Sequence, residues 1–286
     1  MKMPRFGAHA FIWAADWSSE VTERVLGAAA QAGLDFVEIP LLNPARLEVG
    51  LTKALLQRYC LACTCSLGLP VEASLPEHPQ AATRFLIEAL EVAHQVGSPV
   101  LTGVTYATLG ALSGRAPSEE DYRCIAQALR PVAQHAASLG MSLGIEPVNR
   151  YETYLLNLAS QALDLIERID EPNVFLHLDT YHMNIEEKGF RNPIVQAGSR
   201  LRYIHLSESD RGTPGTGNVR WDEVFAALAE IGFDGDLVME SFVAPNPEIA
   251  RATCLWRRVV DDPDALVREG LAFLRGKAQQ HGLLHG

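Results

Sequence analysis

The stretch GIEPVNRYETYLLN, residues 144–157, places an acidic residue at the end of a short apolar run and crowds polar groups behind it. The run itself, residues 141–145, follows Gly140 and has the length and apolar character of a buried strand. Glu146 ends it. A carboxylate there is poorly placed for a core and well placed for a site, so the stretch predicts a strand that delivers an acid to a functional pocket.

The same arrangement recurs along the chain. Apolar runs typical of strands are each followed by helical or helix-compatible sequence, at a repeat of roughly 30 residues. The predicted strands are residues 6–13, 34–43, 60–69, 100–106, 141–145, 173–179, 201–208 and 236–242. The predicted helices are residues 18–33, 51–59, 81–96, 118–139, 158–169, a short one ending at 199, 221–231 and a C-terminal tail at about 264–280. Residues 181–187, YHMNIEE, are predicted to be a polar connection.

This alternation predicts an α/β fold, a (β/α)₈ TIM barrel that forms a single domain over residues 1–286. No linker or low-complexity segment divides the chain. An open doubly wound sheet is the alternative fold. The sequence argues against it because the first predicted strand is not followed by a GxGxxG turn.

Composition narrows the class of partner. The formal net charge of −11 opposes attraction to nucleic acid and to anionic membrane surfaces. No apolar run approaches the roughly 18 residues of a membrane span, and the N-terminus lacks a cleavable apolar leader. Five cysteines, an odd number in a large chain, argue against a disulfide framework. These features predict a cytoplasmic protein with a small-molecule partner, and neither a nucleic-acid nor a membrane partner.

The last four predicted strands each end in one polar residue of a kind that binds metals. These residues are Glu146, Asp179, His205 and Glu240. In a TIM barrel the C-terminal ends of the strands face one mouth, so the four side chains converge, and three carboxylates would repel one another without a cation. Oxygen ligands with one nitrogen favour Mn²⁺, Mg²⁺ or Co²⁺ over structural Zn²⁺. Taken alone, a Glu or Asp at a strand end is more often a helix cap or a salt-bridge partner, and it is the four residues together that favour a site.

Four motifs carry a family resemblance. GIEPVNRYE, HLDTYHMN, YIHLSESDRGTPGTG and VMESF resemble the sugar isomerase/epimerase TIM-barrel superfamily, and within it the group of D-tagatose, D-psicose (allulose) and L-ribulose 3-epimerases. The resemblance covers essentially the whole chain. It implies one divalent metal ion, Mn²⁺ first with Co²⁺ or Mg²⁺ as alternatives, and a homodimer or homotetramer. The metal ligands that it implies are Glu146, Asp179, His205 and Glu240.

The resemblance also implies an activity, inversion of C3 in free ketohexoses or ketopentoses such as D-tagatose, D-fructose/D-psicose and L-ribulose. Removing a C3 proton next to the carbonyl builds charge on the C2 oxygen, and a metal would stabilise the resulting cis-enediolate. Glu146 and Glu240, on the fifth and eighth predicted strands, would transfer protons on opposite faces of C3. The residues implied to bind the first carbons of the sugar are Glu152, His182 and Arg211.

Weaker predictions concern the rim of the site. Trp13 and Phe242 are predicted to cover the distal end of the sugar, with Leu42 and Tyr106 as lesser candidates, although an aromatic side chain in a barrel is commonly core. His9 and Glu38 are predicted to support the metal ligands from behind, with simple burial as the alternative.

Several other functions stay open on the sequence. The loop at residues 212–217, GTPGTG, could bind phosphate, but it contains no lysine, so we expect it to place Arg211 and expect a free sugar as substrate. The nearest alternative activity is an aldose–ketose or hydroxypyruvate-type isomerase. A metal-dependent endonuclease of the same fold would need further His and Asp ligands and a basic surface. A sugar-binding protein with an inactive site is disfavoured because both proton-transfer carboxylates are present.

Overall fold

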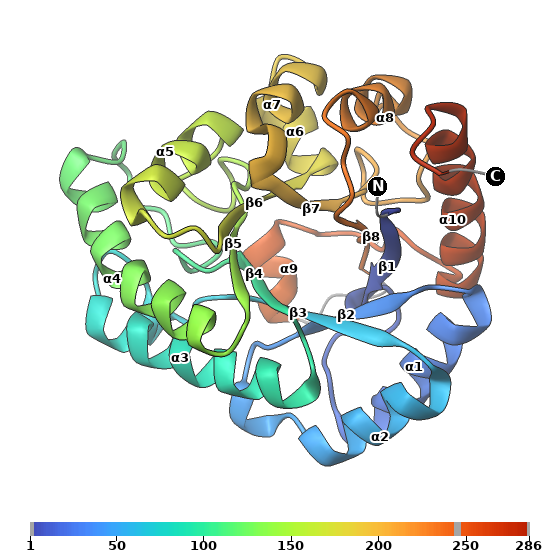
Figure 1. The fold of residues 1–286 in the computed structure, drawn as a ribbon, viewed down its shortest axis with the longest axis horizontal. Helices are drawn as coiled ribbons and strands as arrows, with labels where there is room; N and C mark the ends of the chain where they lie inside the picture. The colour runs from blue at the N-terminus through green and yellow to red at the C-terminus, as the bar shows by residue number, and fades with distance from the viewer. Residues whose placement is uncertain (1–2, 243–246, 285–286) are drawn as a thin grey trace.

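Eight parallel strands close into a barrel in chain order in the computed structural model, which describes residues 3–242 and 247–284 (Figure 1). β1 pairs with both β2 and β8, which closes the sheet. The strands are β1 (Arg5–His9), β2 (Phe36–Pro40), β3 (Ala62–Gly68), β4 (Val100–Val104), β5 (Ser142–Ile145), β6 (Val174–Asp179), β7 (Leu201–His205) and β8 (Asp236–Met239). The predicted TIM barrel, a single domain, is confirmed.

Helices surround this barrel and bury their apolar faces against it (Figure 1). They are α1 (Ser19–Ala32), α2 (Val49–Tyr59), α3 (Pro79–Val96), α4 (Glu119–Ser138), α5 (Ala159–Ile169), α6 (Thr180–Glu186), α7 (Arg191–Ala197), α8 (Trp221–Glu230), α9 (Pro247–Thr253) and α10 (Pro263–Gln280). Short 3₁₀ helices are η1 (Ala10–Ile12), η2 (Pro44–Arg46), η3 (Val71–Ala73) and η4 (Gly198–Arg200). Among the described residues, no helix combines the length and the apolar character that crossing a bilayer requires.

Two local predictions were wrong, and both errors arise from caps. The first strand ends at His9 rather than Trp13, because His9 Nδ1 accepts the backbone N–H of Phe11 at 3.1 Å and starts η1. Most of residues 181–187, predicted to be a polar connection, lie in the helix α6. Asp179 Oδ1 accepts the backbone N–H of Tyr181 at 2.7 Å, and this N-cap begins a helix directly at the strand end.

Packed side chains fill the inside of the barrel below the ends of the strands. The inner cluster consists of Phe36, Phe175, Tyr203 and Val238. Two glycines make room for its rings: a Cβ at Gly7 would lie 2.4 Å from the Phe36 ring, and one at Gly144 would lie 2.8 Å from the Phe175 ring. The barrel is therefore a solid core that supports a site at one end.

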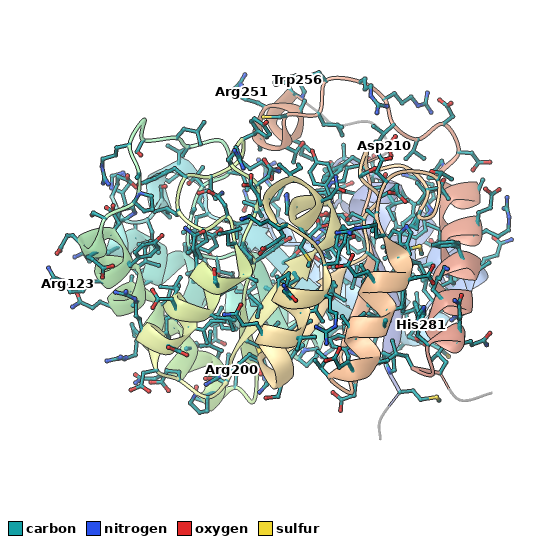
Figure 2. All side chains as sticks on the ribbon, turned by 90° about the horizontal axis from the view of Figure 1, so that it is seen from above. Arg123, Arg200, Asp210, Arg251, Trp256 and His281 are labelled. Atoms are coloured by element: carbon teal, nitrogen blue, oxygen red, sulfur yellow. The ribbon has the colours of Figure 1, made fainter. Side chains whose placement is uncertain are left out.

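That end carries the loops that follow the strands. Asp210, Arg251 and Trp256 all lie there in Figure 2, whereas Arg200, which precedes β7, lies toward the opposite end. Helix α9 lies over the mouth of the barrel in both views (Figures 1 and 2). The mouth is the surface at which all the strand-end residues can meet.

Candidate active site

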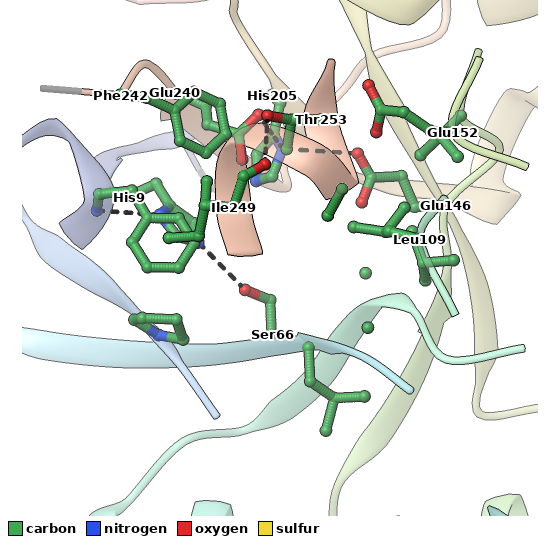
Figure 3. Close-up of a pocket in the computed structure, with 18 of the residues that line it drawn as sticks. His9, Ser66, Leu109, Glu146, Glu152, His205, Glu240, Phe242, Ile249 and Thr253 are labelled. Carbon is green, nitrogen blue, oxygen red and sulfur yellow. Dashed lines mark hydrogen bonds and ion pairs between the residues drawn. The ribbon is translucent and has the colours of Figure 1, made fainter. Parts of the chain in front are cut away.

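The four strand-end residues meet around one nitrogen atom. His205 Nδ1 lies 3.5 Å from Glu146 Oε1, 3.8 Å from Asp179 Oδ2 and 3.4 Å from Glu240 Oε2. Asp179 and His205 end β6 and β7, while Glu146 and Glu240 directly follow β5 and β8. Figure 3 shows Glu146 on one side of His205 and Glu240 on the other. Four strands thus deliver three carboxylates and one imidazole to a single space.

His205 is held in place from inside the barrel. Its Nε2 lies 2.8 Å from Glu38 Oε2, and the hydroxyl of Tyr203 donates to the same oxygen at 2.6 Å. Burial opposes ionisation of this carboxyl, but His205 and His9 lower the pKa of Glu38 to about 2. An ionised Glu38 only accepts, so Nε2 of His205 carries a proton and Nδ1 faces the three carboxylates.

The carboxylates have unequal tendencies to ionise. Burial raises the pKa of Glu146 to about 7 and the pKa of Glu152 to about 8. Burial also raises the pKa of Asp179. Glu240 differs, because Arg211 and His205 outweigh burial and hold its pKa well below the usual range. One side of the site therefore holds an ionised carboxylate and the other a carboxyl close to half protonated at neutral pH.

The residues present fit a divalent cation. His205 Nδ1 is buried and makes no hydrogen bond, although three carboxylates surround it. Burial opposes protonation of His205, but Glu38 and Glu240 raise its pKa well above the usual value, and Arg211 contacts only two of the three carboxylates. Positive charge is therefore favoured in this space, and a divalent cation would supply it. Candidate ligand groups, each with atoms within 4.8 Å of one another, are Glu146–His177–His205, Glu146–Asp179–His182 and Asp179–His205–Glu240. Oxygen atoms predominate among these ligands, as Mn²⁺, Mg²⁺ and Co²⁺ prefer.

Arg211 reaches this space from the loop after β7. Its Nη1 donates to Asp179 Oδ2 at 2.7 Å and also to Glu240. The guanidinium lies over the ring of Tyr181, 4.2 Å from its centroid. Arg211 has a φ of 65°, a left-handed backbone that is unfavourable for a residue with a Cβ. A fixed positive charge thus lies against two of the carboxylates.

Asn149 forms hydrogen bonds to both Glu152 and His182, the other two residues predicted to bind the first carbons of the sugar. Its side-chain amide donates to Glu152 Oε1 at 2.7 Å, and its backbone N–H donates to His182 Nδ1 at 3.2 Å. Burial lowers the pKa of His182, so the ring is neutral and carries its proton on Nε2. That nitrogen lies 3.7 Å from Asp179 Oδ2. Both Glu152 and His182 line the same cavity.

The cavity at the mouth has a volume of about 190 Å³. This is below the roughly 300–1,000 Å³ of pockets for drug-sized ligands, so it favours a small substrate. Its charged groups come from the second half of the barrel, and apolar side chains form the remaining wall. The apolar lining includes Phe11, Leu42, Leu67, Leu109, Phe242 and Ile249. The charged side of the cavity can bind the polar, reacting atoms of a substrate, and the apolar side can pack against its carbon atoms.

Two of the rim predictions need correction. Trp13 does not line the cavity: its indole Nε1 donates to Asp264 Oδ1 at 2.8 Å, which turns the ring toward α10. Tyr106 is fully buried and donates its hydroxyl to the backbone oxygen of Glu146 at 3.0 Å, so it supports the end of β5 from behind. Leu42 and Phe242 do line the cavity, as does His9.

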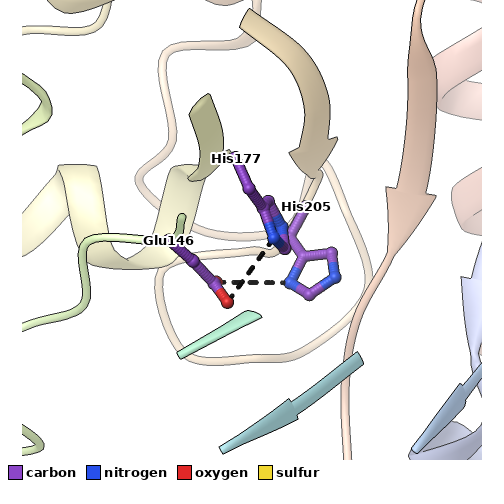
Figure 4. Close-up of side chains that lie close together, drawn as sticks. All are labelled: Glu146, His177 and His205. Carbon is purple, nitrogen blue, oxygen red and sulfur yellow. Dashed lines mark ion pairs between the residues drawn. The ribbon is translucent and has the colours of Figure 1, made fainter. Parts of the chain in front are cut away.

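The sequence reasoning missed His177. Its Nδ1 lies 3.6 Å from Glu146 Oε2 and 3.0 Å from Thr102 Oγ1, and the ring stands against His205 (Figure 4). His177 precedes Asp179 by two residues, so alternation along the strand places both on the inner face. That spacing was the available signal. The sequence also did not single out Phe11 and Ser66, which line the cavity, or Asn149 and Ser207, which hydrogen-bond to Glu152 and Arg211.

Comparisons with known proteins give one consistent family. The profile of the xylose isomerase-like TIM barrel family matches residues 26–277. The chain is 39% identical over 280 residues to the L-ribulose 3-epimerase of Methylomonas sp. (strain DH-1), covering 96% of this chain and 98% of the relative. It is 36% identical over 285 residues to the ketose 3-epimerase of Arthrobacter globiformis, covering 96% of each. The crystal structure of D-allulose 3-epimerase from Methylomonas sp. in complex with D-allulose superposes with a TM-score of 0.92 at 38% identity, covering 97% of this chain and 98% of that one.

Proposed function

The chain belongs to the xylose isomerase-like TIM barrel family, and we propose that it is a metal-dependent isomerase that inverts C3 of free ketoses. The observation that carries the proposal is the placement of Glu146 and Glu240 on either side of His205 in a small cavity. The names of the relatives, L-ribulose 3-epimerase and ketose 3-epimerase, support the choice of carbon and substrate class.

In this proposal the two flanking carboxylates move the proton. One takes the C3 proton from its face of the sugar, and the other returns a proton to the opposite face, which inverts the centre. Glu146 and Glu240 lie on either side of His205, and a carboxylate can both accept a proton and return one. A divalent cation held by Glu146, Asp179, His205 and Glu240 would supply positive charge where negative charge develops on the sugar oxygens.

The other polar residues orient the substrate. Arg211 cannot lose its proton, so it donates hydrogen bonds to an oxygen of the first carbons and contributes fixed charge. Glu152 and the Nε2 proton of His182 address neighbouring hydroxyls. Phe242, whose ring centroid is 5.7 Å from that of Phe11, covers the distal carbons.

A hydrogen bond within the loop at residues 212–217 favours a free sugar over a sugar phosphate as the substrate. The backbone N–H of Gly215 donates to the carboxylate of Glu208 at 2.8 Å. The carboxylate of Glu208 thus accepts the hydrogen bond of a backbone N–H that could otherwise bind a phosphate group.

The proposed partners are one Mn²⁺ ion, with Co²⁺ or Mg²⁺ as alternatives, and a second copy of the chain in a homodimer or homotetramer. Exposed apolar side chains support self-association, since Tyr151 is 58% and Trp256 74% exposed. Trp256 lies at the end of the barrel that carries the cavity (Figure 2).

Proton exchange in D₂O tests the proposed reaction. The protein with Mn²⁺ is incubated with a panel of free ketoses, and NMR identifies the carbon that gains deuterium. We expect deuterium at C3 together with the C3-epimeric product. Deuterium at C1 with an aldose product would instead establish the aldose–ketose isomerase, and exchange with phosphorylated sugars alone would contradict the free-sugar assignment.

Metal binding should depend on pH in a defined direction. The raised pKa of Glu146, about 7, means that a proton competes with the cation below neutrality. We expect the apparent affinity for Mn²⁺ to rise as the pH rises from acid through neutral, because Glu146 must lose its proton to bind the cation. His205 must do the same, since Glu38 and Glu240 raise its pKa well above the usual value despite its burial. Calorimetric titration between about pH 5.5 and 8.5 measures this. An affinity that does not change over this range would remove Glu146 from the ligand set.

A further inference from the structure

Glu208 lies three residues after the end of β7, is fully buried and does not line the cavity. Its carboxylate nevertheless accepts four hydrogen bonds. Oε1 accepts the backbone N–H groups of Ser209 and Val219 at 2.8 and 3.0 Å. Oε2 accepts the backbone N–H of Gly215 at 2.8 Å and the indole N–H of Trp221 at 3.0 Å. Three of the donors come from the start, middle and end of a single loop, and the fourth, Trp221, begins α8, so this one side chain contacts the loop along its whole length.

The loop closes tightly around the carboxylate. A Cβ added at Gly217 would lie 2.6 Å from Glu208 Oε1, so a larger residue there would have to displace the carboxylate. Arg211 is carried by the same loop, and its backbone N–H donates to the backbone oxygen of Glu208 at 2.9 Å. The left-handed backbone of Arg211 is unfavourable in itself and persists because its surroundings hold it.

We propose that Glu208 is a positioning residue, which gathers the N–H groups of this loop and thereby holds the guanidinium of Arg211 at the cavity during ketose turnover. The inference rests on the proposed function, because turnover is its readout. Glutamine cannot replace the carboxylate, since its amide nitrogen is a donor and would face N–H groups that also donate. The proposed role of Glu208 therefore requires that both side-chain oxygens accept hydrogen bonds.

A double-mutant cycle tests this role. Glu208→Gln is expected to lower kcat/KM about 10- to 100-fold, as a displaced positioning group does, while calorimetric Mn²⁺ affinity stays within about threefold. The double variant Glu208→Gln/Arg211→Ala should be no slower than Arg211→Ala alone. The role of Glu208 would be overturned if the double variant lost kcat/KM by the product of the two single losses. It would also be overturned if Glu208→Gln had the kinetics of the wild type.

The chain offers a matched control. Glu187, directly after α6, also accepts a backbone N–H, that of Ala159 at 2.9 Å, and it lies outside the cavity. Glu187→Gln should therefore retain the turnover of the wild type. If Glu208→Gln does not fold, Trp221→Phe removes one of the four donors and leaves the carboxylate. Trp221→Phe should lower kcat/KM by less than Glu208→Gln does, and it should cause no further loss of kcat/KM when combined with Arg211→Ala. A further loss in that combination would overturn the role of Glu208.

Failure of the proposed function and failure of the Glu208 role give different experimental results. C3 exchange by the wild type is measured first, and no exchange with any free ketose would overturn the proposed function and this role together. Exchange by the wild type with multiplying losses in the cycle would overturn only the role of Glu208.

Discussion

Glu240→Gln is expected to lower C3 epimerisation about 10²- to 10⁴-fold, the range that a single general acid–base group contributes. Glutamine keeps the shape of the side chain but can no longer take or return a proton. Glu146 remains on the other side of His205 and can still act on its own face of the sugar. One epimer should therefore exchange its C3 proton with solvent without inverting.

This partial reaction makes the test specific. In D₂O, Glu240→Gln should label one of the two epimers at C3 while forming almost no product, and Glu146→Gln should label the other epimer. Glu187→Gln provides the control, because this carboxylate accepts the backbone N–H of Ala159 at 2.9 Å and lies outside the cavity. If both active-site variants label the same epimer, the assignment of opposite faces is wrong, and wild-type turnover by Glu240→Gln would exclude it from proton transfer.

The barrel and its four convergent residues could be predicted because the relevant signals are local. Each strand is a short apolar run, and parallel strands closed into a barrel all end at the same mouth. The position of Glu146 or Glu240 relative to its own strand end was therefore enough to place it. No contact between distant residues had to be known in advance.

The remaining features depend on contacts that the sequence does not reveal. Trp13 follows the first strand closely, but its direction is set by Asp264, which lies 251 positions away. The ladder between β6 and β7 shifts register between Leu176 and His177, so the inner neighbours of His177 do not follow from counting residues. The role of Glu208 depends on N–H groups that converge only once the loop is folded.

Removal of divalent metal is expected to abolish turnover and to lower thermal stability. Glu146, Asp179 and Glu240 surround His205 Nδ1, and Arg211 contacts only two of these three carboxylates. A cation that binds the folded protein at about 100 times its Kd adds about 2.7 kcal/mol to the free energy of unfolding. For a domain of this size each kcal/mol moves Tm by about 2–4 °C, so chelation should lower Tm by roughly 5–10 °C.

Thermal denaturation with and without a chelator measures this effect independently of turnover. Asp179→Asn supplies the comparison, because it keeps the side-chain volume, weakens the site by one charge and should reduce the Tm shift on adding Mn²⁺. Re-addition of Mn²⁺ or Co²⁺ to the chelated wild type should restore both Tm and C3 epimerisation. Full turnover after exhaustive chelation, with an unchanged Tm, would mean that Arg211 and a protonated His205 balance the buried carboxylates and that the four strand-end residues hold no metal.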